Sequence, residues 1–216
     1  MKKLISLACL ALVASQSFGA LSLLTSRAQI TETDYVEWGD LGAEGVFPTN
    51  PFLVSTHGTP FMVKGQNGSG LFWRVDQGSF WPGNMPSGSN LLYSGDALSL
   101  TGAKTCNAFG VDIQANNIGE FKATIEAFDG LGDSMGSFDV WGDSEFLSGT
   151  ATFLGIRDTE GAIHRVKISV VGASGGSDFA IDRVSYECCL PVPEPASMTA
   201  LGLGALALLR KKSKKA

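Results

Sequence analysis

Histidine is scarce in this chain, and its scarcity excludes several kinds of catalytic site. Only His57 and His164 are present among 216 residues. A nucleophilic triad needs an imidazole beside its nucleophile, but His57 lies in STHGTP without a G-x-S-x-G motif to serve, and His164 is expected in a strand. A glycosidase needs two carboxylates that face the same cleft. Glu120 and Glu126 are candidates for such a pair, but their positions are typical of the solvated face of a strand. The residue types therefore predict a protein that is not an enzyme.

Positive charge is also scarce between the two ends. Of the 16 basic residues, seven lie at the ends, as Lys2, Lys3 and the five that follow Leu209; of the 21 acidic residues, only Glu194 lies there. Residues 20–191 thus hold 9 basic against 20 acidic residues, a net charge of about −11. This balance argues against nucleic acid or an anionic membrane face as the partner, because both need positive charge at the contact.

Helical periodicity is absent from the middle of the chain, which instead shows short alternating apolar runs between turns rich in its 27 glycines. Residues 109–113 and 121–127 alternate most clearly, and Asn116–Gly119 between them predicts a hairpin. We expect an all-β fold, an antiparallel β-sandwich of jelly-roll type. The expected strands are 34–38, 59–64, 71–75, 91–93, 97–100, 109–113, 121–127, 135–140, 150–156, 163–171 and 178–188.

The N-terminal segment has the layout of a secretory signal peptide. Lys2 and Lys3 precede an apolar run from Leu4 to about Val13, and small residues follow up to Gly19. The alternative is a lipoprotein signal in which Cys9 is the modified cysteine. Only five residues would then separate Lys3 from Cys9, so an ordinary signal peptide is favoured. We expect a signal helix in residues 1–19, export by the Sec machinery and a mature chain that begins at Ala20.

The C-terminal segment combines an extended tripeptide, an apolar run and a basic end. Residues 196–209 carry no charge and would reach roughly 21 Å as a helix, against roughly 30 Å for a hydrocarbon core. Basic residues next to a membrane segment stay on the cytoplasmic side, so the body would lie outside. We therefore expect a short transmembrane helix followed by a cytoplasmic basic anchor made of Arg210, Lys211, Lys212, Lys214 and Lys215. A terminal core helix is the alternative, which Gly202 and Gly204 disfavour.

These three parts resemble the PEP-CTERM sorting signal of Gram-negative bacteria. The resemblance implies that Pro193, Glu194 and Pro195 are recognised by the membrane enzyme exosortase, which processes the tail. Both prolines fix φ and lack an N–H, so the tripeptide stays extended. The resemblance implies a precursor anchored in the inner membrane and then a product at the cell surface or in the extracellular polymer. The chain would divide into a signal peptide (1–19), a β-sandwich (20–191) and a sorting signal (192–216).

The body resembles a recurrent group of PEP-CTERM proteins over most of residues 34–187, through segments such as DYVEWGDLG, FKATIEAFDGLG and DFAIDRVSYE. No activity is carried over from this group. We expect a module that binds or structures extracellular polysaccharide without turnover; the alternative is a secreted hydrolase that acts on carbohydrate. Candidate tryptophans for stacking on a sugar are Trp73, Trp81 and Trp141, and Trp81 is preferred because its loop, SFWPG, is irregular.

Cysteines and turn aspartates complete the candidate sites. Cys9 leaves with the signal peptide, so Cys106, Cys188 and Cys189 remain, and an oxidising compartment predicts one disulfide between Cys106 and Cys188 or its neighbour. Neither histidine lies near a cysteine, so no metal site of that kind is expected. Calcium remains an open alternative, because oxygen ligands at turns suit it; the candidates are Asp129, Asp133, Asp178 and Asp182.

Overall fold

The computed structural model of the chain describes residues 19–56, 58–66, 70–81, 83–172 and 174–188. The expected signal helix, sorting tripeptide, transmembrane helix and basic anchor lie outside these residues, as do His57 and Cys189. Within the described ranges, no helix is both long enough and apolar enough to span a bilayer.

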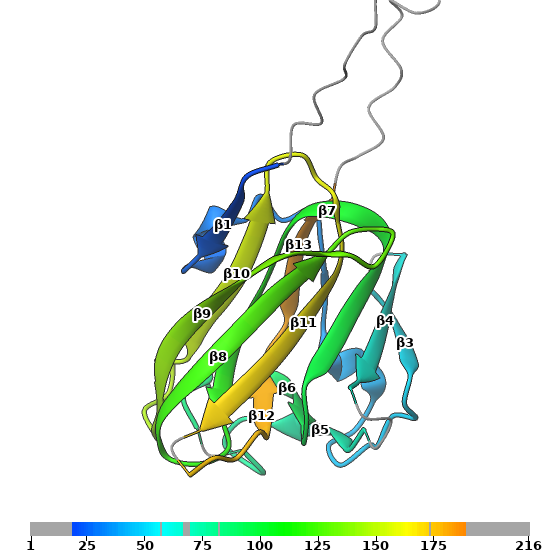
Figure 1. Cartoon of the computed structure of the whole chain (residues 1–216). Coiled ribbons are helices and arrows are strands. Elements are labelled where there is room, and N and C mark those ends of the chain that lie inside the picture. Colours follow the sequence, from blue (N-terminus) through cyan, green and yellow to red (C-terminus); the bar gives the residue numbers. More distant parts are fainter. Residues whose placement is uncertain (1–18, 57, 67–69, 82, 173, 189–216) are drawn as a thin grey trace, which may run out of the picture.

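Strands make up most of the described chain (Figure 1), and all paired strands are antiparallel. The all-β antiparallel prediction is confirmed. The elements are β1 (Leu21–Leu24), η1 (Arg27–Gln29), β2 (Asp34–Val36), η2 (Trp38–Leu41), β3 (Phe52–Thr56), β4 (Thr59–Gly65), β5 (Phe72–Asp76), β6 (Asn90–Ser94), β7 (Leu98–Ala115), β8 (Gly119–Phe128), β9 (Ser134–Ser144), β10 (Thr152–Asp158), β11 (Ile163–Gly172), β12 (Phe179–Ile181) and β13 (Val184–Cys188).

Strand β7 organises the fold because it belongs to both layers. Its first part pairs with β4 and β11, whereas residues 108–115 pair with β10, β12 and β13. Residues 103–105 are all exposed and interrupt the alternation between the two parts, and a Cβ on Gly102 would lie 3.0 Å from the backbone oxygen of Lys104. The strand bends at this point, at the top of Figure 1.

Two layers follow from this bend. The front sheet has the order β3-β4-β7-β11-β8-β9 and uses the first part of β7. The back sheet begins with the order β1-β10-β7. On the other side of β7, residues 106–110 pair with β13, which pairs with β2, and residues 113–115 pair with β12, which is followed by β6 and β5. The described chain ends, near β1 and β13, both lie at the top of Figure 1.

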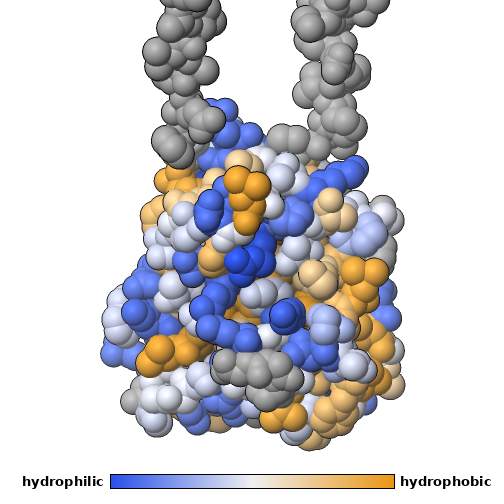
Figure 2. All heavy atoms as spheres, turned by 45° about the vertical axis from the view of Figure 1, so that its right-hand side comes forward, coloured by the Kyte–Doolittle hydropathy of each residue, from blue (hydrophilic) through white to orange (hydrophobic). Residues whose placement is uncertain are grey.

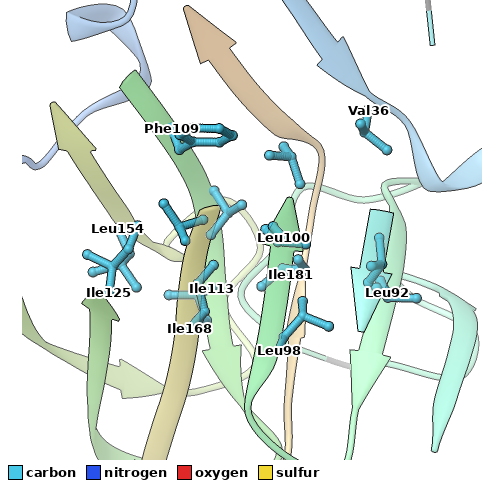
Figure 3. Close-up of a cluster of buried hydrophobic side chains, with 14 of the residues drawn as sticks. Val36, Leu92, Leu98, Leu100, Phe109, Ile113, Ile125, Leu154, Ile168 and Ile181 are labelled. Atoms are coloured by element: carbon cyan, nitrogen blue, oxygen red, sulfur yellow. The ribbon is translucent and has the colours of Figure 1, made fainter. Parts of the chain in front are cut away.

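The core fills the space between the sheets (Figure 3). Alternate residues of β8 and β11, such as Ile125 and Ile168, face inward from the front sheet, and Phe109 and Leu154 face them from the back sheet. Because alternate residues of a strand point to opposite faces, the residues between them must face outward. The core therefore decides which residues form the outer faces of the sandwich.

The outer face of the back sheet is largely covered. Leu24, Ile30 and Phe153 pack on Ala108 near the N-terminal segment, and a Cβ on Gly110 would lie 2.8 Å from Ile30, so a glycine there allows the segment to approach. The loop between β5 and β6 covers the next stretch, where Val75, Trp81, Met85, Leu91 and Ala180 form a second buried cluster.

Several predicted strands differ from those observed. The expected strands 97–100 and 109–113 belong to one strand, β7, which begins at Leu98, and β1 and β3 were not predicted. The expected closing strand 178–188 is divided into β12 and β13, because its pairing with β7 shifts by one residue between Ile181, which lies opposite Ile113, and Ser185, which lies opposite Gly110. His164 was expected on the buried face of its strand, but an irregularity between Ile163 and Arg165 buries Ile163 instead.

Candidate functional site

The outer face of the front sheet, called the front face below, carries the outward side chains of β4, β7, β11, β8 and β9. Strand registers align these side chains in rows across the sheet. One row joins Met62, Thr101, Arg165 and Phe128, and the next joins Lys64, Ser99, Lys167 and Glu126. Farther along the strands follow the rows Ser169, Thr124 and Asp139, and then Val171, Lys122 and Trp141.

Trp141 supplies the exposed aromatic ring of this face. Its side chain is 70% exposed, and Val171 in the same row is 57% exposed. Lys122 lies between them in the register. A large, exposed indole next to hydrogen-bonding groups is suited to stack on the apolar face of a ligand ring.

Asp139 orders the polar groups beside Trp141. Its carboxylate accepts hydrogen bonds from Thr124 Oγ1 at 2.6 Å and from Lys122 Nζ at 3.2 Å. These bonds favour the ionised form, the Thr124 bond most of all, and lower the pKa of Asp139. Asp139 therefore links Thr124 in its own row to Lys122 in the row of Trp141.

A groove of about 460 Å³ occupies the other end of the front face. Met62 and Phe128 supply apolar walls, and the Arg165 guanidinium lies over the Phe128 ring, 3.6 Å from its centroid. This cation–π contact holds the guanidinium against the ring. The remaining lining residues are Lys64, Gly65, Gln66, Ser99, Thr101 and Lys167.

The groove concentrates positive charge on an otherwise acidic body. Among the described residues, the Lys and Arg side chains that form no ion pair are Lys64, Lys104, Arg165 and Lys167, and all but Lys104 line the groove. Figure 2, which brings the right-hand side of Figure 1 forward, shows hydrophilic residues over the middle of the visible face and hydrophobic ones toward its lower right. Cations that form no ion pair within the described chain are available to an anionic ligand.

Trp81, the preferred stacking residue, is buried, so that prediction is wrong. Its side chain is 6% exposed and its Nε1–H donates to Gln114 Oε1 at 2.8 Å. Trp73 is half-buried within an aromatic cluster that includes Phe47, Phe80 and Tyr93. A glycine- and proline-rich loop suggested exposure of Trp81, but the loop folds back onto the outer face of the back sheet.

The four aspartates considered for calcium lie in three separate places. Asp129 Oδ1 accepts backbone N–H bonds from Leu131 and Asp133, both at 2.9 Å, and so closes its own turn. Asp178 accepts from Tyr93 and Asn116, and burial together with that carboxylate raises the pKa of Tyr93 to about 12. No group of three or more potential ligands in the described ranges is arranged to hold a metal ion.

Asp182, the fourth of them, belongs to a charged cluster between the two covering segments of the back sheet. Arg27 reaches Asp182 at 2.8 Å and Asp112 at 2.7 Å, and also donates to Ser185 Oγ. Burial, followed by repulsion from Asp112, raises the pKa of Asp182 to about 7. Arg27 belongs to η1, and its guanidinium binds Asp112 of β7 and Asp182 between β12 and β13. These contacts hold η1 against the back sheet.

Cys106 and Cys188 form a disulfide in the structure. The bond ties the end of β13 to the bend of β7, immediately before the C-terminal segment.

Glu120 and Glu126, the two carboxylates considered as a glycosidase pair, lie six residues apart on β8, which separates them by roughly 20 Å. That separation exceeds the roughly 5–10 Å between the carboxyl groups of glycosidases.

Comparison with known proteins identifies the end of the chain. Residues 191–214 match the family model for the PEP-CTERM protein-sorting motif. The chain carries a PEP-CTERM sorting motif. The resemblance seen in Pro193, Glu194, Pro195 and the segment after them is confirmed, and with it a signal for protein sorting. No curated protein matches this chain.

Solved structures similar to this chain include a DUF4465 family protein from Bacteroides caccae, with 14% identity, a TM-score of 0.41, and coverage of 78% of this chain and 99% of that one. The CBM22-1 xylan-binding domain from Paenibacillus barcinonensis has 12% identity and a TM-score of 0.35 over 69% of this chain and 99% of that one. A family 29 carbohydrate-binding module, CBM29-2, has 15% identity and a TM-score of 0.26 over 82% and 99%. Likenesses of this size carry no inference about what the chain binds.

The basic groove was not predicted from the sequence. Lys64, Arg165 and Lys167 are outward residues of alternating strands, but β4 and β11 are separated by about a hundred residues and meet only through β7. In the sequence, Arg165 and Lys167 alternate with Val166 and Ile168. This pattern predicts that the two basic residues face solvent, but it does not indicate which strands lie beside them.

Proposed function

We propose that this PEP-CTERM protein is exported, held at the inner membrane as a precursor and delivered by an exosortase to the cell surface or extracellular polymer. The sorting motif supports this route. Its body, a jelly-roll-like sandwich in residues 20–191, serves there as a non-catalytic module that binds extracellular polysaccharide on the front face.

The observation that carries the binding proposal is the composition of the front face. An exposed indole, Trp141, stands at one end of the face, and a groove with three cations lies at the other. Lys167 and Val171 are four residues apart on β11, so the row of Trp141 lies roughly 13 Å along the strands from the row of Lys167, and Trp141 itself lies two strands away on β9, roughly 10 Å to the side. That span is long enough for a short stretch of an extended glycan.

Charge narrows the class of polysaccharide. Lys64, Arg165 and Lys167 have no carboxylate partner within the described chain, and Glu126 is the acidic residue in their rows. Ligand carboxylates or sulfates would form charge-assisted hydrogen bonds with these donors. The proposed ligand is therefore an acidic polysaccharide, such as one that contains uronic acids.

The test is retention of the exported chain on immobilised acidic and neutral polysaccharides, with product analysis in the same samples. Trp141→Ala is expected to weaken retention about tenfold, as truncation of a central aromatic contact does. Phe80→Ala is the matched control, because Phe80 is 62% exposed but packs beside Trp73 on the other layer. Equal losses in both variants would refute the assignment to the front face, and released sugars would favour the hydrolase.

A further inference from the structure

Asp158 is a fully buried carboxylate with one oxygen that lacks a donor. The residue ends β10 and is 0% exposed. Its Oδ2 accepts the backbone N–H of Ala162 at 2.8 Å, whereas Oδ1 has no hydrogen-bond partner within the described chain. A buried carboxylate oxygen without a partner is costly, because it has lost its hydration without compensation. The fold thus leaves a buried acceptor without a donor among the described residues.

The unpartnered oxygen faces Gly19. A Cβ on Gly19 would overlap Asp158 Oδ1 and would lie 2.8 Å from Glu160 Cγ. Strand β1 pairs with β10 so that Leu21 lies opposite Asp158, and the backbone N–H of Ala20 donates to Thr159 Oγ1 at 3.1 Å. The strand register therefore holds the backbone nitrogen of Ala20 beside the acidic end of β10.

The space around this contact is acidic throughout. A hollow of about 370 Å³ is lined by Gly19, Leu21, Ser134, Met135, Ala162 and the acids Asp129, Asp133, Asp158 and Glu160. No Lys, Arg or His is among its lining residues. The local chemistry therefore suits a small cationic group with several N–H donors.

We propose that the hollow binds the α-ammonium group that signal-peptide cleavage creates at Ala20. Water hydrolyses the Gly19–Ala20 peptide bond, the departing segment keeps the new carboxylate, and Ala20 keeps the amine, which takes up a proton. Removal of Gly19 frees the position against Asp158 Oδ1. The ammonium then pairs with that oxygen while it retains Thr159 Oγ1 as an acceptor, and Glu160 adds negative charge beside it.

The consequence is a sandwich that reaches its full stability only after cleavage. In the precursor the nitrogen of Ala20 is a neutral amide with one N–H, and Asp158 Oδ1 has no partner among the described residues. In the exported chain the same position carries a positive charge and three donors. The inference rests on the proposed export route, but not on the proposed ligand.

A double-mutant cycle tests the site. The chain from Ala20 to Ala216 is prepared with a free α-amine and with an acetylated one, each with Asp158 or with the Asp158→Asn substitution. With Asp158 present, the free amine is expected to raise the melting temperature by roughly 3–6 °C over the acetylated chain. In the Asp158→Asn background that carboxylate is gone and Glu160 alone remains beside the amine, so most of the difference between the two preparations should disappear, whatever the substitution itself costs. An equal difference in both backgrounds would overturn the proposal.

Asp133→Asn is the matched control, because Asp133 lines the same hollow but is exposed. This variant should retain the difference between free and acetylated chains. The α-amine itself should titrate above the ordinary value of about 7.7–8.0, as followed by NMR. Its contribution to stability is then present below that ordinary pKa and is lost as pH rises through the raised one. An unshifted pKa would contradict the ion pair.

Two further outcomes are distinguishable. If calcium raises the melting temperature of the acetylated and free chains alike and acetylation has no effect, the hollow is a metal site and the proposal fails. N-terminal sequencing of the exported chain tests the route separately. A chain that keeps residues 1–19 refutes the export route, whereas a chain that starts at Ala20 and melts independently of its amine refutes only the ammonium site.

Discussion

Trp81 and Gln114 are joined by a buried hydrogen bond from the indole Nε1–H to the side-chain oxygen, over 2.8 Å. The same oxygen accepts the backbone N–H of Asn84 at 2.8 Å, and the Gln114 amide nitrogen donates to the backbone oxygen of Glu145 at 3.2 Å. One outward residue of β7 thus attaches the loop after β5 and the segment after β9 to the back sheet. The outer face of this sheet is closed at that point.

Replacement of Gln114 by Ala should therefore destabilise the sandwich. The change leaves two buried donors, Trp81 Nε1–H and Asn84 N–H, without an acceptor, so the free energy of unfolding should fall by roughly 2–4 kcal/mol. Urea denaturation followed by tryptophan fluorescence measures it. Gln66→Ala, at an exposed position, is the control and should be nearly neutral. A loss below about 0.5 kcal/mol for Gln114→Ala would contradict the role of this bond.

The Cys106–Cys188 disulfide should contribute substantially to stability, because it closes a long loop. The two cysteines are 82 residues apart, and a loop of that length corresponds to roughly 4–5 kcal/mol in the chain-entropy account. The double variant Cys106→Ala with Cys188→Ala should melt well below the parent chain under oxidising conditions. Cys189→Ser is the control and should leave the melting temperature unchanged; equal melting of all three chains would argue against the bond.

Stability should depend on pH through Asp182. Burial raises its folded-state pKa to about 7, and an unfolded aspartate titrates near about 3.9. Because the folded pKa is the higher one, this contribution is complete below about pH 4 and is lost as pH rises through about 7. Asp182→Asn should flatten that decline in denaturation curves recorded across the window. Asp139→Asn, on the front face, should not, and a slope unchanged by Asp182→Asn would contradict the assignment.

Binding of acidic polysaccharide should depend on salt through the groove. Replacing both Arg165 and Lys167 by Gln should weaken binding by roughly 2–20-fold at low salt and reduce its dependence on ionic strength. Lys104→Gln is the matched control, since Lys104 is exposed and forms no ion pair within the described chain but lies at the bend of β7, outside the groove. Affinity gels over a range of salt concentrations supply the measurement, and identical losses in both variants would reject the groove as the site.

Sorting should depend on the tripeptide. Replacing Pro193, Glu194 and Pro195 by Ala should abolish surface delivery and leave the precursor mass unprocessed, because the extended segment that the enzyme would recognise is lost. Pro191→Ala is the neighbouring control and should still be delivered. Intact mass and cell fractionation of both variants decide the outcome; normal delivery of the triple variant would refute the sorting role of these residues.

Part of the fold could be predicted because it depends on local alternation. Strand β8 is an example, since Phe121, Ala123, Ile125 and Ala127 all face the core as expected. The course of β7 could not be predicted in this way. Its exposed residues 103–105 look like a loop in the sequence, yet they form the bend that carries one strand from the front sheet to the back sheet.

The same contrast holds for the candidate site. The terminal sorting motif and the antiparallel all-β class could be predicted without coordinates, because the first depends on contiguous residues and the second on local alternation. The burial of Trp81, the exposure of Trp141 and the meeting of Lys64 with Arg165 and Lys167 in one groove emerged only from the folded chain. Burial and proximity depend on which strands pair, and β7 brings together segments that are far apart in the chain.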